Sequence, residues 1–383
     1  MKKVVIFLMA IVLIVPTVTQ AEENVVPGAR NAILVEANTG QVIYEKGMHD
    51  RVAVASLTKM MSQLIILEHI ENGSLTWDEQ VKASANAAGY GGTQIYLQPG
   101  EVMSVRDLMK GISMASANDA TVVLAERIAG TEENFVKLMM EKAQKLGLQN
   151  TNFVNPTGLD EENHYSSAYD LSIIARELMK HEQIFEFTSL YEDYLRVDTP
   201  NKFWLVNTNK LVRFYEGADG LKTGFTDNAM YCMAVTAKRS GMRLLAIVLG
   251  EEISKVRNQE TMALLDYGFN LYTVDILKEK ETIVDKVEIE RGNVDFLEIV
   301  TKDEISVLRK KDEASKKYTE EVEFGEITLP LKKGTVIGKL KIMDSNNLIG
   351  EYDLIANQDV KKKSFFSLLL ENLKDIVVGS LVF

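Results

Sequence analysis

Two hairpin-like segments, separated by a long helical region, place the strongest limit on the fold of this chain. Residues 32–46, AILVEANTGQVIYEK, contain two apolar runs around a turn at 38–40, and residues 230–249 contain two more around Ser240-Gly241. Between them, apolar periodicity predicts helices over residues 56–71, 104–129, 133–146 and 167–180, the second of which is broken into two near 113–118. Strands at both ends of a helical region predict one antiparallel sheet covered by helices, in which early strands pair with late ones.

The last third of the chain has a different pattern. From residue 280 to 360 the helical periodicity fades, and short runs such as 287–290, 322–324 and 337–342 alternate apolar and charged residues. This alternation predicts a small all-β domain with one solvated face. We therefore expect four segments: a signal peptide over 1–21, a large domain that carries the chemistry over 22–278, a small all-β domain over 279–361, and an amphipathic helix over 362–383.

The N-terminus has the pattern of an export signal. Lys2 and Lys3 precede an apolar run over 4–15, and Thr19-Gln20-Ala21 offers a cleavage site with a small final residue. The alternative interpretation is a transmembrane anchor, but the apolar run is too short for a comfortable span. We therefore expect cleavage after Ala21 and an exported protein.

The C-terminal segment has the pattern of a membrane-surface helix. Residues 364–383 follow Lys361-Lys362-Lys363 and place polar residues on one helical side and large apolar residues on the other. Charges in the middle of the segment argue against a spanning helix, whereas a long apolar face behind basic residues is typical of a helix in the bilayer surface. The alternative is a helix docked on the protein itself. We expect peripheral attachment to the outer face of the cytoplasmic membrane.

Charge and composition exclude several functional classes. The chain carries 55 acidic and 43 basic residues, a net charge of -12, which argues against nucleic acid as a partner. With Cys232 as its one cysteine and only four histidines, it has no disulfide framework and no expected metal site. Cys232 lies in a strand-like apolar run, and we interpret it as a small buried side chain rather than a nucleophile.

The most reactive pattern is Ser56-Leu57-Thr58-Lys59, the only Ser-x-x-Lys in the chain. On a helix, Ser56 and Lys59 share one face, and their neighbours are apolar. A serine hydroxyl needs an adjacent base to become a nucleophile, and a lysine is a base only when burial or another cation lowers its pKa. The alternative is a capping serine beside a lysine that reaches solvent. The catalytic hypothesis therefore requires a second positive charge from elsewhere in the chain.

Two further elements could complete such a site. Ser116-Ala117-Asn118 interrupts a strongly apolar helical region, so its polar groups are expected in a cleft. Lys222-Thr223-Gly224, directly before the second hairpin, would supply the second cation. Gly224 has no side chain and would let an extended peptide approach the strand edge.

Ser-x-x-Lys, Ser-x-Asn and Lys-Thr-Gly, in this order, form the pattern of penicillin-binding proteins and class A β-lactamases. The segments ASLTKMM, LQPGE, TGLDEENHYSSAYDL, DGLKTGFT and RLLAIVLG resemble the low-molecular-mass serine D-alanyl-D-alanine carboxypeptidases of the S11 type. The resemblance covers nearly the whole mature chain. It implies an α/β, transpeptidase-like domain, with a five-stranded antiparallel sheet flanked by helices and a helical subdomain, followed by the small β domain.

The resemblance also implies a role for each residue of the pattern. Ser56 would be acylated by the peptidoglycan stem pentapeptide or by a β-lactam, and Lys59 would accept its proton. Ser116 would relay a proton to the leaving amine, and Asn118 would position the substrate. Lys222 would supply positive potential, while Thr223 and Arg257 would hold the terminal carboxylate of the substrate. The oxyanion hole would use the N–H groups of Ser56 and Phe225; some relatives carry histidine at the second position. His164 matches a histidine near the family's site, with packing under the cleft as an equal alternative.

The resemblance implies an exported, membrane-associated carboxypeptidase that removes a terminal D-alanine and needs no metal or organic cofactor. The chain has no Glu-x-x-Leu-Asn element between Asn118 and Lys222, so rapid β-lactam hydrolysis is not expected. The alternatives are a transpeptidase or endopeptidase on the same fold, and a non-catalytic cell-wall-binding scaffold.

Overall fold

The computed structural model describes residues 24–364 and Leu369. The predicted signal peptide, 1–21, and nearly all of the predicted terminal helix lie outside the described residues. Within the described part, no helix has the length and apolar character needed to span a membrane.

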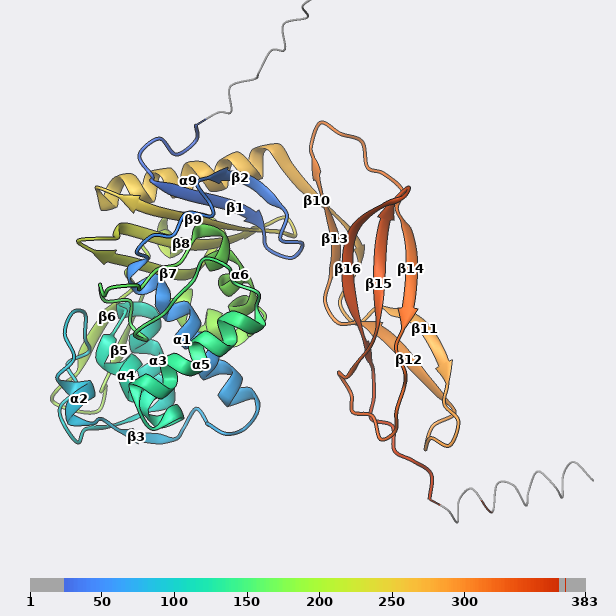
Figure 1. Ribbon diagram of the computed structural model, residues 1–383, viewed down its shortest axis with the longest axis horizontal. Coiled ribbons are helices and arrows are strands. Elements are labelled where there is room, and N and C mark those ends of the chain that lie inside the picture. Colours follow the sequence, from blue (N-terminus) through green and yellow to red (C-terminus); the bar gives the residue numbers. More distant parts are fainter. Residues whose placement is uncertain (1–23, 365–368, 370–383) are drawn as a thin grey trace, which may run out of the picture.

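A five-stranded antiparallel sheet forms the centre of the larger domain (Figure 1). Its strand order is β2-β1-β9-β8-β7. The bounds are β1 Asn31–Glu36, β2 Val42–Lys46, β7 Ala218–Thr226, β8 Met230–Arg239 and β9 Met242–Glu251. Strand β1 pairs with β9 from Asn31 opposite Leu249 to Glu36 opposite Leu244, so the first hairpin joins the last one. The sheet confirms the predicted antiparallel arrangement of early and late strands. Strand β7 ends the sheet, and its outer edge has no strand partner among the described residues.

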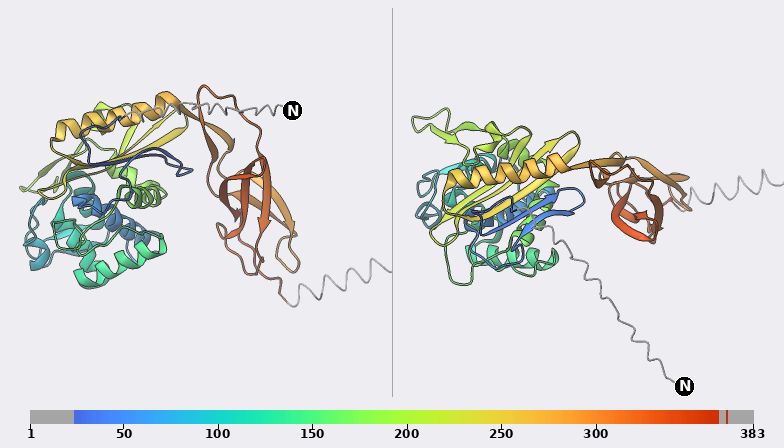
Figure 2. Two further views of the ribbon diagram at one scale, coloured as in Figure 1. Left: turned by 45° about the horizontal axis from the view of Figure 1, so that its top comes forward. Right: turned by 90° about the horizontal axis from the view of Figure 1, so that it is seen from above.

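Helices cover both faces of this sheet (Figures 1 and 2). One face carries the helical subdomain, whose main elements are α1 Lys59–Glu71, α3 Val105–Lys110, α4 Asn118–Ala129, α5 Glu132–Lys145 and α6 Ala168–Met179. Side-chain oxygens of Ser104, Thr131 and Ser167 cap the N-termini of α3, α5 and α6. The buried apolar side chains of these helices pack on Ile33 and Ile247 of the sheet, which makes this the larger of the two cores around it.

The opposite face of the sheet is covered by α9, Ser254–Leu271. Helix α9 was not among the predicted helices. Its buried side includes Arg257, Glu260 and Thr261, as well as Leu264 and Leu265, so polar residues interrupt the apolar periodicity by which a helix is recognised.

Short elements join the main ones. The bounds are η1 Ala55–Thr58, β3 Gln80–Lys82, α2 Ala85–Ala88, β4 Val102–Ser104, η2 Gly111–Ala115, η3 Glu182–Ile184, α7 Phe185–Thr188, β5 Glu192–Leu195, β6 Phe203–Val206 and α8 Leu211–Phe214. Two of these elements lie at the predicted motifs. The turn η1 replaces the start of the predicted helix 56–71, and the π-helical turn η2 lies at the predicted break near 113–118.

A separate all-β unit follows α9 directly (Figure 1). Its strands are β10 Tyr272–Lys278, β11 Ile283–Glu288, β12 Phe296–Thr301, β13 Ile305–Lys310, β14 Thr319–Phe324, β15 Val336–Asp344 and β16 Asn347–Ala356. One sheet has the order β11-β12-β16-β15-β14, and β10 pairs with β13. The unit has its own apolar core, which includes Leu297, Leu340 and Leu354. It confirms the predicted all-β C-terminal domain.

Candidate active site

Ser56 and Lys59 lie at the junction of η1 and α1, where they form a hydrogen-bonded pair. The Nζ atom of Lys59 is 2.9 Å from Ser56 Oγ and donates to the Thr157 carbonyl at 2.6 Å. Lys59 is fully buried, whereas Ser56 is partly exposed. A neutral amine that donates to a carbonyl keeps one lone pair, and that lone pair can accept the hydroxyl proton of Ser56.

The surroundings of Lys59 favour this neutral form. Burial is the largest cause that lowers the pKa of Lys59 well below its usual range, and the charge of Lys222 lowers it further. The charge of Asp119 acts in the opposite direction. The structure therefore brings Lys59 into electrostatic range of the second cation that the catalytic hypothesis required.

Ser116 and Asn118 flank the point where η2 ends and α4 begins. Ser116 has a left-handed backbone with φ of 63°. Asn118 donates from its backbone N–H to the Thr93 carbonyl at 2.7 Å and from Nδ2 to the Gly91 carbonyl at 2.8 Å. Ser116 Oγ and Asn118 Oδ1 are buried and have no partner among the described residues. Buried polar atoms are normally paired, so these two point to a ligand that completes the site.

Lys222 lies on β7, the edge strand of the sheet. Its side chain is buried, and its Nζ donates to the Thr223 carbonyl at 2.8 Å. Burial, followed by the charge of Arg257, lowers the pKa of Lys222 to about 7. The charge of Arg257 thus acts on Lys222, and the charge of Lys222 acts on Lys59, so each positive group disfavours a proton on the next.

Gly224 lets β7 approach the turn that carries Ser56. A Cβ atom at position 224 would lie 2.9 Å from the backbone N of Ser56 and 3.0 Å from Ala55 Cβ. Any side chain there would force the two segments apart. The absence of a side chain therefore keeps the Ser56 N–H close to β7 at Gly224, as an oxyanion hole between these elements requires.

Phe225 follows Gly224 and stands at the rim of the site. Its side chain is 47% exposed and packs on Tyr231 of β8, with ring centroids 4.3 Å apart. Thr223, on the other side of Gly224, donates its hydroxyl to Thr208 Oγ1 at 2.7 Å.

Arg257 reaches the same region from α9. Its guanidinium donates to Asn258 Oδ1 at 2.8 and 3.1 Å and to the Cys232 carbonyl at 3.5 Å, and Cys232 pairs with Gly224 across β7 and β8. No carboxylate of the described residues forms an ion pair with Arg257, although its side chain is buried. Burial lowers the pKa of Arg257 to about 10. A buried guanidinium without an anionic partner is suited to bind a carboxylate ligand.

His164 and Cys232 do not join the reactive group. The His164 ring contacts Thr58 rather than Ser56 or Lys59, with Nε2 2.8 Å from Thr58 Oγ1. Cys232 is buried, and burial raises the pKa of its thiol to about 11, which suppresses the nucleophilic thiolate. Within the described part of the chain, no group of three or more His, Cys, Asp or Glu side chains is arranged to hold a metal ion.

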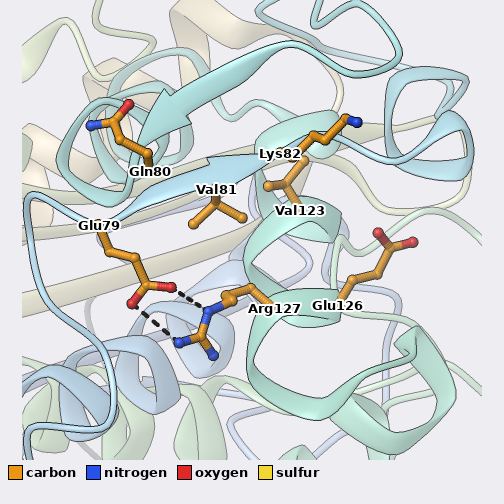
Figure 3. Close-up of a pocket in the computed structure, with 7 residues that line it drawn as sticks. All are labelled: Glu79, Gln80, Val81, Lys82, Val123, Glu126 and Arg127. Carbon is orange, nitrogen blue, oxygen red and sulfur yellow. Dashed lines mark hydrogen bonds and ion pairs between the residues drawn. The ribbon is translucent and has the colours of Figure 1, made fainter.

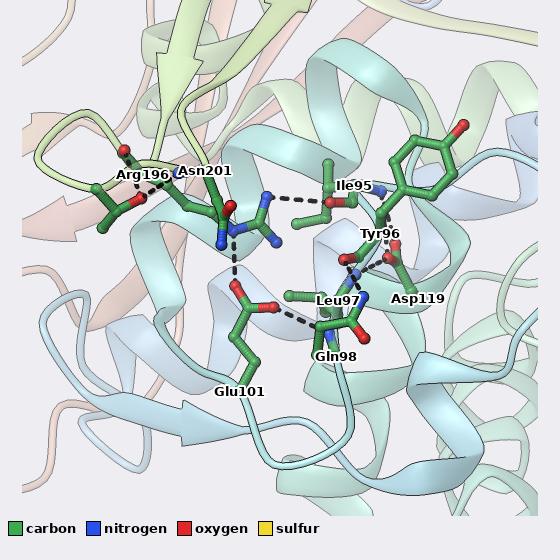
Figure 4. A network of polar contacts seen from close by, with 9 residues as sticks. Ile95, Tyr96, Leu97, Gln98, Glu101, Asp119, Arg196 and Asn201 are labelled. Carbon is green, nitrogen blue, oxygen red and sulfur yellow. Dashed lines mark hydrogen bonds and ion pairs between the residues drawn. The ribbon is translucent and has the colours of Figure 1, made fainter.

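Asp119, which was not predicted, binds the backbone of the loop at residues 95–97 (Figure 4). Its carboxylate accepts from the backbone N–H groups of Ile95, at 3.1 Å, and Leu97, at 3.0 Å. Arg196 fastens the same loop, donating to the Ile95 carbonyl at 3.1 Å and to Glu101 at 2.6 Å. The loop that passes Asn118 is therefore clamped on both sides. The signal that could have identified Asp119 is its position as an acidic residue in the first turn of α4, within an otherwise apolar region of the sequence.

Thr157 also escaped prediction because it acts through its backbone carbonyl. Asn155 shapes this turn: its Oδ1 accepts from the N–H groups of Thr157, at 3.2 Å, and Gly158, at 2.7 Å. A backbone acceptor leaves no distinctive residue type in the sequence.

Figure 3 shows a surface depression with a different set of lining residues. It has a volume of about 350 Å³ and is lined by Glu79, Gln80, Val81, Lys82, Val123, Glu126 and Arg127. Glu79 and Arg127 pair across it. None of the predicted site residues lines it.

Comparisons with known proteins identify the family to which the chain is similar. Residues 17–253 match the D-alanyl-D-alanine carboxypeptidase family, and residues 272–362 match the C-terminal domain of penicillin-binding protein 5. The D-alanyl-D-alanine carboxypeptidase DacF of Bacillus subtilis is 44% identical over 348 residues, which cover 91% of this chain and 90% of the relative.

Two solved structures are also similar. Penicillin-binding protein 5 from Haemophilus influenzae has a TM-score of 0.68 and 29% identity, covering 88% of this chain and 98% of that one. Penicillin-binding protein D2 from Listeria monocytogenes, in its ampicillin-bound form, has a TM-score of 0.57 and 34% identity, covering 63% of this chain and 98% of that one.

Proposed function

The chain belongs to the D-alanyl-D-alanine carboxypeptidase family of serine peptidases, and from this premise we propose that it removes the terminal D-alanine from peptidoglycan stem pentapeptides through an acyl-enzyme on Ser56. The observation that carries the proposal is the 2.9 Å contact between Ser56 Oγ and the buried Nζ of Lys59. This contact supplies a base for the hydroxyl, and burial together with the charge of Lys222 keeps that base from holding a proton.

In the acylation step, Ser56 Oγ attacks the carbonyl carbon of the penultimate D-alanine, and its proton passes to Lys59 Nζ. The developing oxyanion would accept from the backbone N–H groups of Ser56 and Phe225, which the close approach at Gly224 keeps together. The C–N bond then breaks, and the terminal D-alanine leaves as an amine that receives a proton through Ser116. The Ser116 Oγ atom, which has no partner among the described residues, is free to make this relay.

Substrate recognition follows from the charges at the β7 edge. The stem peptide would extend along the open edge of β7. Its terminal carboxylate would accept from the Arg257 guanidinium and from the Thr223 hydroxyl, which would turn from Thr208 Oγ1 to donate to it. Asn118 would hold the peptide through Oδ1, which has no other partner in the described part of the chain. A peptide that ends at this residue has a free carboxylate to bind Arg257, whereas a peptide that continues past it has none.

Water completes the cycle by attacking the acyl-enzyme ester, which frees Ser56 and returns its proton. The same serine would open a β-lactam ring, and the similar Listeria protein is described in its ampicillin-bound form. Because the chain has no Glu-x-x-Leu-Asn element between Asn118 and Lys222, the penicilloyl-enzyme would hydrolyse slowly and accumulate.

The site would act on the cell wall from outside the cell. The predicted signal peptide, 1–21, supports export, and the amphipathic pattern of 364–383 supports attachment to the outer face of the cytoplasmic membrane. The all-β domain lies between the catalytic domain and that segment in the chain.

Mass spectrometry tests the central step. Incubation of the purified chain with a penicillin is expected to raise the intact mass by one adduct, found on the peptide that contains Ser56 and absent from Ser56→Ala. Product analysis on a pentapeptide, with and without an amine acceptor, then separates hydrolysis from transpeptidation. An adduct on another residue would exclude the mechanism, and a product joined to the amine would reassign the reaction to transpeptidation.

A further inference from the structure

The turn that presents Ser56 has an unusual backbone. Ala55, immediately before Ser56, has φ of 48°, in the left-handed region that residues with a Cβ atom rarely adopt. Such a conformation persists only where the surrounding structure holds it. The contacts of the Ala55 carbonyl therefore decide where the hydroxyl of Ser56 points.

Two residues hold that carbonyl. The Thr58 hydroxyl donates to the Ala55 carbonyl at 2.9 Å. Gly158 packs against the same oxygen so closely that a Cβ at position 158 would lie 1.9 Å from it and 2.8 Å from Thr58 Oγ1. Gly158 follows Thr157, whose carbonyl accepts from Lys59. Residues 157 and 158 therefore contact both the turn that carries Ser56 and the side chain of Lys59.

The His164 ring lies between Thr58 and Val154 and forms a hydrogen bond with each. The backbone N–H of Val154 donates to His164 Nδ1 at 3.2 Å, so Nδ1 carries no proton. The Thr58 hydroxyl proton points to Ala55, so Thr58 Oγ1 accepts from His164 Nε2–H across 2.8 Å. One arrangement of protons satisfies the whole series, and it contains a neutral imidazole with its proton on Nε2.

We propose that His164 is a positioning residue, which acts through Thr58 to hold the left-handed turn at Ala55 and so aligns Ser56 Oγ with Lys59 Nζ. His164 contacts neither Ser56 nor Lys59, and its function lies in a fixed tautomer. The inference rests on the proposed role of Ser56 as nucleophile and extends it to a residue outside the three motifs.

The charges around His164 agree with a neutral ring. Burial is the main cause that lowers the pKa of His164 to about 4, and the nearby charge of Lys59 lowers it further, while Asp160 raises it. The carboxylate of Asp160 is bound to the Thr226 hydroxyl at 2.7 Å, and Glu161 accepts from the Asn155 amide at 3.4 Å. Both acids are therefore engaged with other groups, and neither makes an ion pair with the ring.

Acylation kinetics test whether His164 acts on Ser56 through Thr58 and Ala55. With a penicillin as reagent, the binding constant and the acylation rate constant are measured separately. His164→Leu and Thr58→Val are each expected to lower the rate constant about tenfold or more, because misplaced reacting groups lose rate, with the binding constant unchanged. His164→Gln, whose amide can donate from the position of Nε2, and Thr58→Ser, which keeps the hydroxyl, are expected to stay within about threefold of the parent.

The double variant His164→Leu/Thr58→Val gives the sharper test. Two residues that act in series lose the same function, so the double variant is expected to acylate no more slowly than Thr58→Val alone. The proposal would be overturned if His164→Leu acylated at the wild-type rate. It would also be overturned if the rate loss of the double variant equalled the product of the two single losses.

A spectroscopic measurement on the wild-type chain covers the case in which a variant does not fold. Nitrogen NMR of the chain labelled at its histidines is expected to show His164 as the Nε2–H tautomer at neutral pH, assigned by the signal that His164→Gln lacks. A protonated Nδ1 would overturn the proposal. Failure of the proposed function is distinguishable, because wild-type Ser56 would then form no adduct at all.

Discussion

The charge of Lys222 lowers the pKa of Lys59, although the two residues lie far apart in the sequence. Lys59 is the first residue of α1, and Lys222 lies on the edge strand β7. Each lysine is buried, and each has a lowered pKa for which a neighbouring cation is the second cause after burial. The fold thus uses like charges, which normally destabilise a protein, to keep an amine neutral beside a hydroxyl.

Removal of the Lys222 charge is expected to shift the acid limb of the profile of acylation rate against pH. In Lys222→Gln the pKa of Lys59 rises because one repelling cation is lost, so Lys59 becomes protonated at a higher pH. The acid limb of the acylation rate should therefore move upward, by about one pH unit. The measurement is the second-order rate constant for a penicillin as a function of pH.

Lys222→Arg is the control for this experiment, because it keeps a positive charge at the same place. Its acid limb is expected to stay near that of the parent. An acid limb that does not move in Lys222→Gln would show that Lys59 is not the titrating base.

A methyl group at position 224 is expected to damage the oxyanion hole. In Gly224→Ala the new Cβ would lie 2.9 Å from the Ser56 nitrogen and would force β7 away from the turn. Loss of an oxyanion-hole donor costs about a hundredfold or more in rate, so acylation should fall by about that factor. The matched control is Gly325→Ala, where the nearest heavy atom would lie 3.7 Å away. Equal acylation by the two variants would contradict the assigned position of the oxyanion hole.

Arg257 is expected to select substrates that have a free terminal carboxylate. Arg257→Ala should raise the KM for a pentapeptide acid by about tenfold or more, since a charge-assisted contact is lost. The KM for an analogue without the carboxylate should change little, so the preference for the acid should disappear. Lys255→Ala, an exposed position on the same helix, is the control and should leave both values unchanged. An unchanged KM for the acid in Arg257→Ala would remove this assignment.

The elements that the sequence predicted well are those with continuous apolar runs, such as the buried strands β1 and β9, or with a clear helical periodicity. The hairpins around Thr39 and Gly241 have clear turns and apolar runs, and their pairing through β1 and β9 followed from the position of the helices between them. Helix α9 was missed because Arg257 and Glu260 occupy its buried side. The hairpin of β5 and β6 was missed because each strand has only four residues.

The predicted site consists of side chains that are proposed to carry the chemistry, whereas the residues that were missed act through contacts with the backbone. Thr157 contributes a carbonyl, Asp119 binds two N–H groups, and Thr58 holds the conformation of Ala55. A backbone contact constrains geometry without requiring a distinctive residue spacing, so only coordinates reveal it. His164 was identified by resemblance, but its partner Thr58 lies inside the Ser-x-x-Lys motif, where sequence patterns treat it as a spacer.

Deletion of residues 364–383 is expected to release the exported protein from membranes while leaving acylation intact. The sequence of the segment predicts an apolar helical face behind three lysines, which would suit binding to an anionic bilayer surface. All of the predicted site residues lie at or before Arg257 in the chain. The measurement is the fraction of penicillin-labelled enzyme that sediments with membranes, at low and high salt. A milder variant that combines Lys361→Gln, Lys362→Gln and Lys363→Gln should weaken attachment mainly at low salt, where charge attraction is strongest. Continued sedimentation of the truncated chain would favour a terminal helix docked on the protein body.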